Sequence, residues 1–439
     1  MNYQEIYQSK KCSPEAAISF IKSGDRVLAG GNPAVLFKAL YDCRDNYKDV
    51  EMYAQFSMVG RSRDYIHNAD MVGHVSFATT TLSPPSSVTT SWPQDNLDQM
   101  SLSFSGLERL IETRIQPAVA IFPGCPMDDE GFINLGCNHG CVRTAIDMGA
   151  KVVVQINEEL LNANTDYYRV HISEVDVLIE AKNPPEERMM MVRDYGEKEE
   201  KLAAAIVERI PNGATIQLGA GGVSTAVGLY LKDHKDLGVH AETILETLIP
   251  LMESGVINNS RKPLLRGISV AGFVNGGART LQHIHNNPNV IIKKLAWVND
   301  SLIISQIPNM VSVNACLAVD LRGQVCSESL GMGFTGGIGG QLDFVEGARK
   351  SPNGQSYLAM HSSVKPKSSD HKISKITLTL PRGSVVTTPA SEVMNIVTEY
   401  GVAELYCKSV KERTQNLIRV ADPEFRESLT YEAKKAGLL

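Results

Sequence analysis

Short apolar runs alternate with helical patterns along the first part of the chain. Arg26 to Ala29, Ala118 to Phe122 and Lys151 to Ile156 have the length and apolar composition of buried strands. Between them, Pro33 to Tyr41 and Val142 to Met148 carry apolar residues at helical spacing. Alternating strands and helices are typical of parallel sheets, whose faces are covered by helices. The pattern therefore predicts an α/β fold with mainly parallel sheets flanked by helices.

The unit of strand, glycine turn and helix occurs twice in the sequence. A single shift along the chain aligns four pairs without a gap, namely Gly24 with Gly213, Val27 with Ile216, Gly30 with Gly219 and Tyr41 with Tyr230. A repeat this long indicates two related domains and not a solenoid. The stretch from Asn183 to Gly196 has linker composition, so we expect one domain at residues 1–190 and the other at 191–439. Clefts between α/β domains are common ligand sites, and we expect the active site in the cleft between these two.

Three further parts of the chain have patterns that predict their secondary structure. Gly267 to Phe273 and Met310 to Val325 carry strand patterns, and the latter turns at Arg322-Gly323 in the manner of a hairpin. The charged portion from Glu392 to Leu439 reads as amphipathic helices on the outside of the second domain. Thr81 to Trp92, rich in Ser, Thr and Pro, is a loop by composition.

The composition argues against nucleic-acid binding, membrane binding and a metal site. The chain has 439 residues and a formal net charge of −6, so neither nucleic-acid nor membrane binding is expected. No run approaches the roughly 18 apolar residues that span a bilayer, and no signal peptide is evident, so we expect a soluble cytoplasmic protein. Cys137, His139 and Cys141 lack a fourth ligand at suitable spacing, and no metal site is expected.

Two glycine-rich segments are candidates for ligand contact. Gly219 to Val223 joins the predicted strand Ala214 to Leu218 to the helical run Ser224 to Asp233. Glycines let the backbone approach a ligand and aim its N–H groups at an anion, although such turns also occur for packing alone. The second segment, Gly331 to Phe344, holds so many glycines that ligand contact is the favoured explanation.

Two other features could be interpreted as catalytic residues, but we do not favour that interpretation. Asp128, Asp129 and Glu130 follow a predicted strand, but acidic turns are usually solvated. His240 precedes a glutamate by two residues, and we expect a structural histidine there and not a base.

Several motifs together resemble the acetyl-CoA hydrolase/transferase family. The resemblance is greatest to 4-hydroxybutyrate CoA-transferases and butyryl-CoA:acetate CoA-transferases, and it covers nearly the whole chain. The motifs are Gly219 to Val223, Leu237 to Glu242, Ser312 to Ala315, Gly336 to Phe344, Val397 to Ala403 and Ala421 to Arg426.

The resemblance implies a fold and a reaction. It implies two related CoA-transferase-type domains and a ping-pong reaction through a glutamyl-CoA thioester on Glu242. CoA is then substrate and covalent intermediate, with no permanently bound cofactor. The family's second glycine segment, which donates a backbone amide to the reacting carbonyl, maps onto Gly339 and Gly340. Its CoA-contacting loop maps onto Gly219, Ala220, Gly221, Gly222 and Val223.

The resemblance implies less about the binding partners and the acyl specificity. Lys365 and Lys367 either contact CoA phosphates or form a solvated basic loop. The other partners implied are short-chain carboxylic acids, and relatives suggest a homodimer or a higher homo-oligomer. Pro389-Ala390 stands where many relatives carry an arginine nearby, which puts the acyl specificity in question. Two alternatives stay open, an acyl-CoA hydrolase that uses the same glutamate and a non-catalytic acyl-CoA-binding protein.

Overall fold

The computed structural model describes residues 2–55, 65–81, 97–137, 140–183, 195–367 and 369–439. The predicted loop Thr81 to Trp92 and the predicted linker Asn183 to Gly196 lie almost entirely outside these ranges. Two compact units are present, Met1–Met189 with Gly272–Trp297, and Met190–Ala271 with Val298–Leu439. Residues 272–297 thus group with the first unit, and the domain boundary between residues 190 and 191 stays a prediction.

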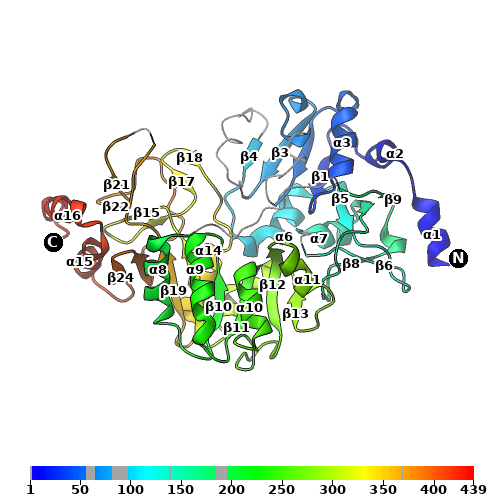
Figure 1. The fold of residues 1–439 in the computed structure, drawn as a ribbon. Coiled ribbons are helices and arrows are strands. Elements are labelled where there is room, and N and C mark those ends of the chain that lie inside the picture. Colours follow the sequence, from blue (N-terminus) through cyan, green and yellow to red (C-terminus); the bar gives the residue numbers. More distant parts are fainter. Residues whose placement is uncertain (1, 56–64, 82–96, 138–139, 184–194, 368) are drawn as a thin grey trace. The chain divides into compact units, whose positions relative to one another are not determined.

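The first sheet has seven strands, and each strand that the structure describes there pairs parallel with its neighbours. Across the sheet they run β4 (Leu97–Gln99), β3 (Val75–Thr79), β2 (Val50–Tyr53), β1 (Arg26–Ala29), β5 (Val119–Gly124), β7 (Lys151–Ile156) and β9 (Val177–Glu180). The connecting helices include α1 (Tyr3–Lys10), α2 (Pro14–Ile18), α3 (Ala34–Asp42), α6 (Leu107–Leu110) and α7 (Val142–Asp147) (Figure 1). All six residues of β5 are buried, as expected for a parallel strand with both faces covered.

The second sheet has eight strands. Strand β10 pairs parallel with β11 and β14, β14 with β19, and β19 with β23, whereas β23 and β24 pair antiparallel at one edge. Its order is β13 (Val290–Ile292), β12 (Ser269–Asn275), β11 (Gly238–Leu245), β10 (Thr215–Leu218), β14 (Met310–Ala315), β19 (Gln355–Ala359), β23 (Asn395–Thr398) and β24 (Gly401–Glu404). Its helices include α8 (Glu197–Val207), α9 (Gly222–Tyr230), α10 (Ile249–Glu253) and α14 (Gln341–Lys350) (Figure 1). Helix α13 (Ser301–Ile304) is a further short helix of this unit. Helix α11 (Ala278–Ile284) follows β12 in the chain, and α12 (Leu295–Val298) follows β13.

The two sheets have equivalent strand orders around their central strands, as the predicted repeat requires. Strand β1 lies between β2 and β5 in the first sheet, and β10 lies between β11 and β14 in the second. The register matches as well, since Arg26 pairs with Glu51 and Thr215 pairs with Gly238 at the start of each central pair. The predicted strands at Arg26–Ala29 and Lys151–Ile156 have the predicted bounds.

The C-terminal portion differs from its prediction. Helices α15 (Val410–Val420) and α16 (Pro423–Lys435) are present, but β23 and β24 occupy part of the stretch predicted as helix. Ile396 and Val397 are fully buried, and β23 pairs with β19, so pairing at the sheet edge outweighs the charged composition around it. The hairpin predicted at Arg322-Gly323 is confirmed, because β15 (Ala318–Asp320) pairs antiparallel with β16 (Val325–Cys326).

Smaller sheets complete the structure. They are β6 (Phe132–Asn134) with β8 (Arg169–His171), β15 with β16 and β22 (Ile376–Thr377), β17 (Ser329–Leu330) with β18 (Gly333–Phe334), and β20 (Ser363–Val364) with β21 (Ile373–Ser374).

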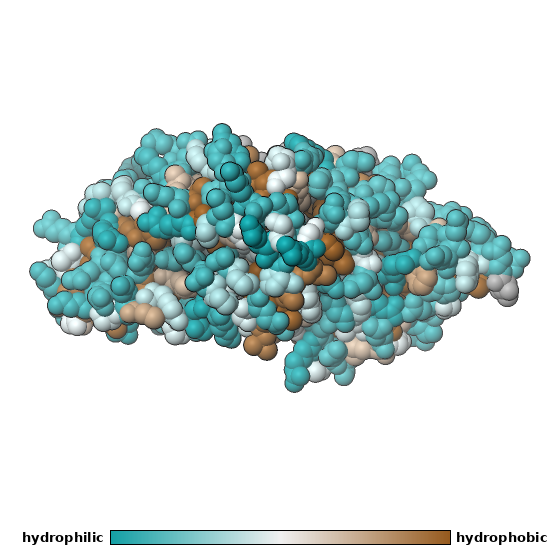
Figure 2. Space-filling model, turned by 90° about the horizontal axis from the view of Figure 1, so that it is seen from below, coloured by the Kyte–Doolittle hydropathy of each residue, from teal (hydrophilic) through white to brown (hydrophobic). Residues whose placement is uncertain are grey.

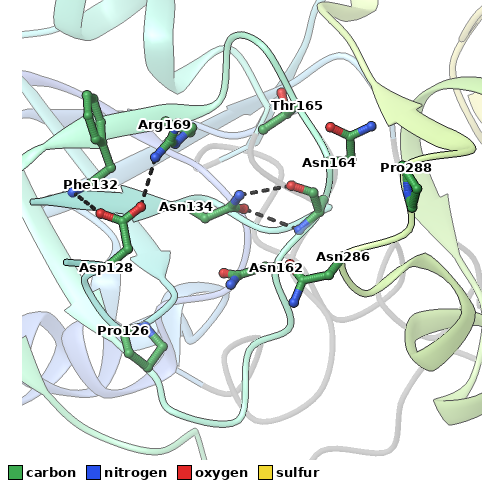
Figure 3. Close-up of a pocket in the computed structure, with 11 residues that line it drawn as sticks. Pro126, Asp128, Phe132, Asn134, Asn162, Asn164, Thr165, Arg169, Asn286 and Pro288 are labelled. Atoms are coloured by element: carbon green, nitrogen blue, oxygen red, sulfur yellow. Dashed lines mark hydrogen bonds and ion pairs between the residues drawn. The ribbon is translucent and has the colours of Figure 1, made fainter. Parts of the chain in front are cut away.

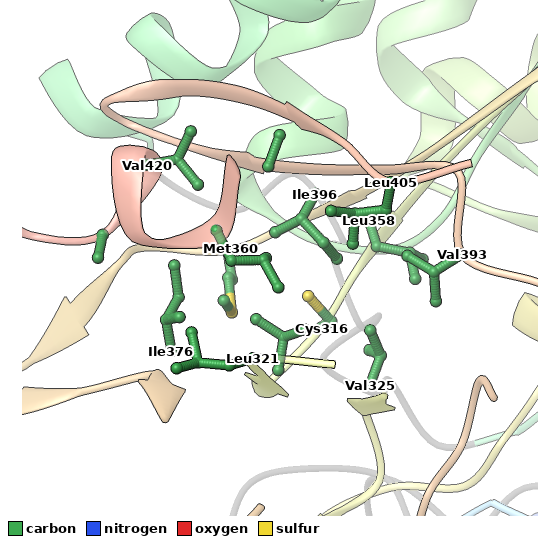
Figure 4. Close-up of a cluster of buried hydrophobic side chains, with 14 of the residues drawn as sticks. Cys316, Leu321, Val325, Leu358, Met360, Ile376, Val393, Ile396, Leu405 and Val420 are labelled. Carbon is green, nitrogen blue, oxygen red and sulfur yellow. The ribbon is translucent and has the colours of Figure 1, made fainter. Parts of the chain in front are cut away.

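A hydrophobic cluster under α15 and α16 packs the C-terminal helices onto the second unit (Figure 4). Ile396 of β23 is fully buried in this cluster, among Leu358, Leu405 and Leu417. Its truncation removes buried methyl groups and leaves a cavity.

We therefore expect Ile396→Ala to lower the free energy of unfolding by about 2–5 kcal/mol. Denaturant unfolding followed by circular dichroism measures this loss. Val410→Ala is the control, because Val410 is 49% exposed and its truncation should change stability by no more than about 0.5 kcal/mol. Equal losses in the two variants would contradict the assignment of the core.

The face shown in Figure 2 is mainly hydrophilic, with hydrophobic side chains in small separate patches. Within the part of the chain that the structure describes, no helix is long and apolar enough to cross a membrane.

Candidate active site

Glu242 lies on β11 beyond the point where the neighbouring strand β10 ends. Seven of the eight residues of β11 are buried, and Glu242 alone is partly exposed. The register between these strands pairs Ile216 with Val239, and its extension by three residues sets Gly219 opposite Glu242. Ligands of parallel α/β sheets bind outside the carboxyl ends of the strands. Gly219 follows the carboxyl end of β10, and Glu242 lies beside that end on the longer strand β11.

The carboxylate of Glu242 is held by two hydrogen-bond donors, the backbone amide of Gly340 and the side chain of Asn299. Its pKa is raised to about 8, first because burial removes the carboxylate from water and second because the charge of Asp343 is near. The two hydrogen bonds act in the opposite direction and lower the pKa. Strongly shifted pKa values cluster at functional sites, so Glu242 is the candidate nucleophile that the geometry favours.

Gly340 lies against this carboxylate at the start of α14. A Cβ atom at Gly340 would lie 2.2 Å from Oε2 of Glu242 and 2.2 Å from Nδ2 of Asn299, so only glycine fits. Gly339 precedes it with a φ of +57°, a conformation that glycine adopts without strain. The structure therefore brings Glu242 and the predicted Gly339-Gly340 segment together, at a helix N-terminus that favours negative charge.

Asn299 and Asp343 complete this constellation, and the sequence did not single them out. Asn299 is fully buried and its Nδ2 donates a hydrogen bond to Oδ2 of Asp343 at 3.2 Å. Asp343 is 6% exposed and sits in the first turn of α14. Asp343 belongs to the second glycine motif and was within reach of sequence reasoning. Asn299 lies between two short helices, α12 and α13, where no pattern marks it.

The first glycine segment is built on a pair of buried amides. Gln217 and Asn314 exchange two hydrogen bonds of 3.0 Å across β10 and β14. A Cβ atom at Gly219 would lie 2.4 Å from Oδ1 of Asn314, so the chain passes too close for any side chain. Gly221 has a φ of +140° and precedes α9, which begins at Gly222. The segment therefore has the strand, turn and helix that the sequence predicted.

The remaining residues of this segment are accessible. Ala220 is exposed, and Gly221, Gly222 and Val223 are partly exposed. Their assignment to CoA contact stays a prediction.

Lys365 lies apart from these contacts. It is exposed on the loop after β20, and its carboxylate neighbour is Asp370 at 3.9 Å. Lys367 is exposed on the same loop. The contacts that the structure gives do not connect either lysine with Glu242 or with the glycine segments.

His240 is structural in its surroundings. Its imidazole is fully buried, and Nε2 lies 2.9 Å from the backbone oxygen of Val298. Burial first, and the charge of Lys262 second, lower the pKa of His240 to about 3, so the ring is neutral near pH 7. Lys262 is itself buried and donates hydrogen bonds to the backbone oxygens of Val239 and Ile268, which ties its loop to β11.

The acidic turn lines a separate pocket of about 330 Å³ in the first unit (Figure 3). Asp128 there accepts hydrogen bonds from the backbone of Glu130 and Phe132 and forms an ion pair of 2.8 Å with Arg169. Asn134 bonds the backbone of Ala163 across the same pocket (Figure 3). These side chains hold the turn to neighbouring segments, and none of the predicted site residues lines the pocket.

The predicted absence of a metal site is not tested. His139 lies outside the described residues, whereas Cys137 and Cys141 are buried free thiols. Over the described ranges, no group of three or more His, Cys, Asp and Glu side chains is placed to hold a metal ion.

Two family models match the chain. The acetyl-CoA hydrolase/transferase N-terminal domain matches residues 1–186, and the C-terminal domain of the same family matches residues 276–433.

Relatives match over the full length. A 4-hydroxybutyrate coenzyme A transferase from Clostridium kluyveri is 34% identical over 99% of this chain and 100% of its own. A butyryl-CoA:acetate CoA-transferase from Anaerostipes caccae is 31% identical over 100% of this chain and 99% of its own. Among solved structures, RipA from Yersinia pestis superposes with a TM-score of 0.92 at 30% identity, with both chains covered completely.

Proposed function

Since the chain belongs to the acetyl-CoA hydrolase/transferase family, we propose that it transfers CoA from a short-chain acyl-CoA to a carboxylic acid. Its relatives over the full length are CoA-transferases. We propose acetyl-CoA or butyryl-CoA as the donor, and 4-hydroxybutyrate or butyrate as the acceptor. The proposal names Glu242 as the nucleophile and CoA as the group carried on it.

The observation that carries this proposal is the pairing of one partly exposed glutamate with two converging donors. Glu242 accepts hydrogen bonds from the Gly340 amide and the Asn299 side chain. Preorganised donors of this kind stabilise an oxyanion as charge develops, and each is worth roughly 10²–10³ in rate.

The proposed reaction balances without a redox step. A carboxylate oxygen of Glu242 attacks the thioester carbonyl, and the C–S bond breaks to give an acyl-glutamyl anhydride and CoA thiolate. The thiolate then attacks Cδ of Glu242, which releases the acyl group as a free carboxylate and leaves a glutamyl-CoA thioester. An incoming carboxylate repeats these two steps in reverse and departs as the new acyl-CoA.

The raised pKa of Glu242 favours its proposed role as the nucleophile, because it makes the ionised form more reactive. A carboxylate of higher pKa is more basic and hence a stronger nucleophile once it is ionised. The cost is that a pKa near 8 leaves most of the enzyme protonated at pH 7, so the rate should rise with pH through this range.

We further propose that Gly219 to Val223 and Lys365 contact CoA. Amide groups at the start of α9 can meet phosphate oxygens, and Lys365 can meet phosphates as an exposed cation. An exposed lysine adds only a modest electrostatic attraction.

For Lys365→Ala we expect the KM for butyryl-CoA to rise about two- to tenfold at low salt, with kcat unchanged. Steady-state kinetics at two ionic strengths measure this change. Lys411→Ala is the control, because Lys411 is likewise exposed and lies on α15, outside this loop. An unchanged KM in the Lys365 variant would show that this side chain is solvated and does not meet CoA.

The function itself is tested by intact mass after brief mixing with butyryl-CoA. A gain equal to CoA less water, on the peptide that holds Glu242, is the expected result. No adduct despite demonstrated CoA binding would contradict a stable glutamyl-CoA intermediate.

Acetate then separates transfer from hydrolysis, the second candidate. Acetyl-CoA formation that depends on added acetate indicates a transferase, whereas release of free CoA at the same rate without acetate indicates a hydrolase. Light scattering of the purified protein tests the predicted homodimer or higher homo-oligomer.

A further inference from the structure

We propose that Asp343 is a positioning residue that holds the Asn299 amide with its N–H groups toward Glu242 throughout the reaction. This inference rests on the proposed function of Glu242. Asp343 is buried, and its Oδ2 accepts a hydrogen bond from Nδ2 of Asn299 at 3.2 Å. It touches Asn299 and not the reacting bond, so its effect is indirect.

The amide of Asn299 has two N–H groups, and each has a carboxylate to bond. One hydrogen bond goes to Asp343 and the other to Glu242. The closeness of the second pair has independent support, because one point, the Cβ position of Gly340, is 2.2 Å from both Nδ2 of Asn299 and Oε2 of Glu242. The oxygen Oδ1 of Asn299 is buried and has no hydrogen-bond partner within the described ranges.

These contacts decide which way the amide faces. When Glu242 is ionised, as it must be to attack, a flipped amide would turn Oδ1 toward two carboxylates, and that repulsion keeps Nδ2 in place. Once Glu242 becomes an anhydride or a thioester, it loses its charge and no longer enforces this orientation. Asp343 still holds the Asn299 amide in this orientation, at the step where the glutamyl carbonyl itself needs a hydrogen-bond donor.

A structural role for Asp343 makes different predictions. An acidic residue in the first turn of α14 also stabilises the helix through its dipole. That role alone would change thermal stability and leave the chemistry of Glu242 as it is.

The charge of Asp343 also sets the direction of a pH effect. The groups that act on Glu242 are Asp343 and the two donors, Gly340 and Asn299. His240 on the same strand is neutral, and Lys262 lies beside it. Because the charge of Asp343 raises the pKa of Glu242, its removal moves the acidic limb of the rate profile to lower pH.

The test is a double-mutant cycle on the full chain with Asp343→Asn, Asn299→Ala and both together. The single-turnover rate of thioester formation with butyryl-CoA is measured across pH. We expect each single variant to lose about 10–100-fold in rate with KM within about twofold, and the double variant to be no slower than the slower single one. Additive losses would overturn the proposal, because Asp343 would then act independently of Asn299.

Two further variants make the result decisive. Glu346→Gln removes a charge from the same helix and should leave the rate and the pH profile unchanged. Asp343→Glu retains a carboxylate acceptor and should recover part of the rate, which keeps the test possible if Asp343→Asn does not fold. An unshifted acidic limb in Asp343→Asn, with lowered thermal stability as the sole effect, would also overturn the proposal.

Glu242→Gln separates the two levels of inference. Ordinary thioester formation in that variant would refute the proposed function. An inactive Glu242→Gln together with an additive cycle would refute the role of Asp343 alone.

Discussion

Replacement of Glu242 by glutamine is expected to lower CoA transfer by at least about 10³-fold while CoA binding stays largely intact. Glutamine has nearly the same shape, but its amide is a poor nucleophile and cannot form the acyl-glutamyl anhydride. The initial rate of acetyl-CoA formation from butyryl-CoA and acetate measures the first effect, and calorimetric titration with CoA measures the second.

Glu246→Gln is the matched control for this prediction. Glu246 follows β11 directly and is partly exposed, as Glu242 is. Its substitution should leave the rate within about twofold. Ordinary turnover in Glu242→Gln would refute the assignment of the nucleophile, and a large loss in Glu246→Gln would show that the strand tolerates no change of charge.

Gly340→Ala is expected to lower kcat by about 10²–10³-fold. Its backbone φ of −96° is accessible to alanine, so the backbone itself is not strained. The added methyl group, however, would lie 2.2 Å from Oε2 of Glu242 and 2.2 Å from Nδ2 of Asn299. Glu242 and the donors must move apart, and misplacement by about 1 Å can cost on the order of 10²-fold in rate.

Gly336→Ala is the control, because a Cβ atom there meets no heavy atom within 4 Å. Steady-state kinetics and thermal unfolding of both variants separate a local effect from general damage. Because the methyl group crowds two buried side chains, a lower unfolding temperature is also expected, and activity is compared at a temperature where both variants are folded. Full activity in this variant would show that the Gly340 amide is not needed.

The fold was largely predictable because its signals are local. The strands at Arg26–Ala29 and Lys151–Ile156 are short apolar runs bounded by breakers, and the glycine turn after Leu218 has the strand and helix that its sequence requires. The shift that aligns Gly30 with Gly219 is likewise visible without a structure. The strand at Asn395–Thr398 was missed, because its helical reading rested on charge, while its strand form depends on pairing with β19.

The candidate site was predictable in part. Glu242 and Gly340 were assigned through resemblance, and the structure places them in contact. Periodicity and spacing alone would not have separated Glu242 from other glutamates, because its environment is created by residues far along the chain. Asn299 could not be assigned from the sequence at all. Its place in the site depends on a hydrogen bond to Asp343, which is far along the chain, and no local pattern encodes that contact.

The matching registers of the two sheets extend to the residues beside Glu242. Val27 pairs with Met52 as Ile216 pairs with Val239, and the same three-residue extension that sets Gly219 opposite Glu242 sets Gly30 opposite Gln55. The first half therefore presents the neutral amide in the position where the second half presents the carboxylate.

The glycine beside that position is matched too. Gly140 precedes α7 by two residues as Gly339 precedes α14, each has a φ of +57°, and a Cβ atom at Gly140 would lie 3.7 Å from Oε1 of Gln55. Cys141 then stands where Gly340 stands. The first half therefore repeats the backbone arrangement around Glu242 but has an uncharged amide in place of the carboxylate.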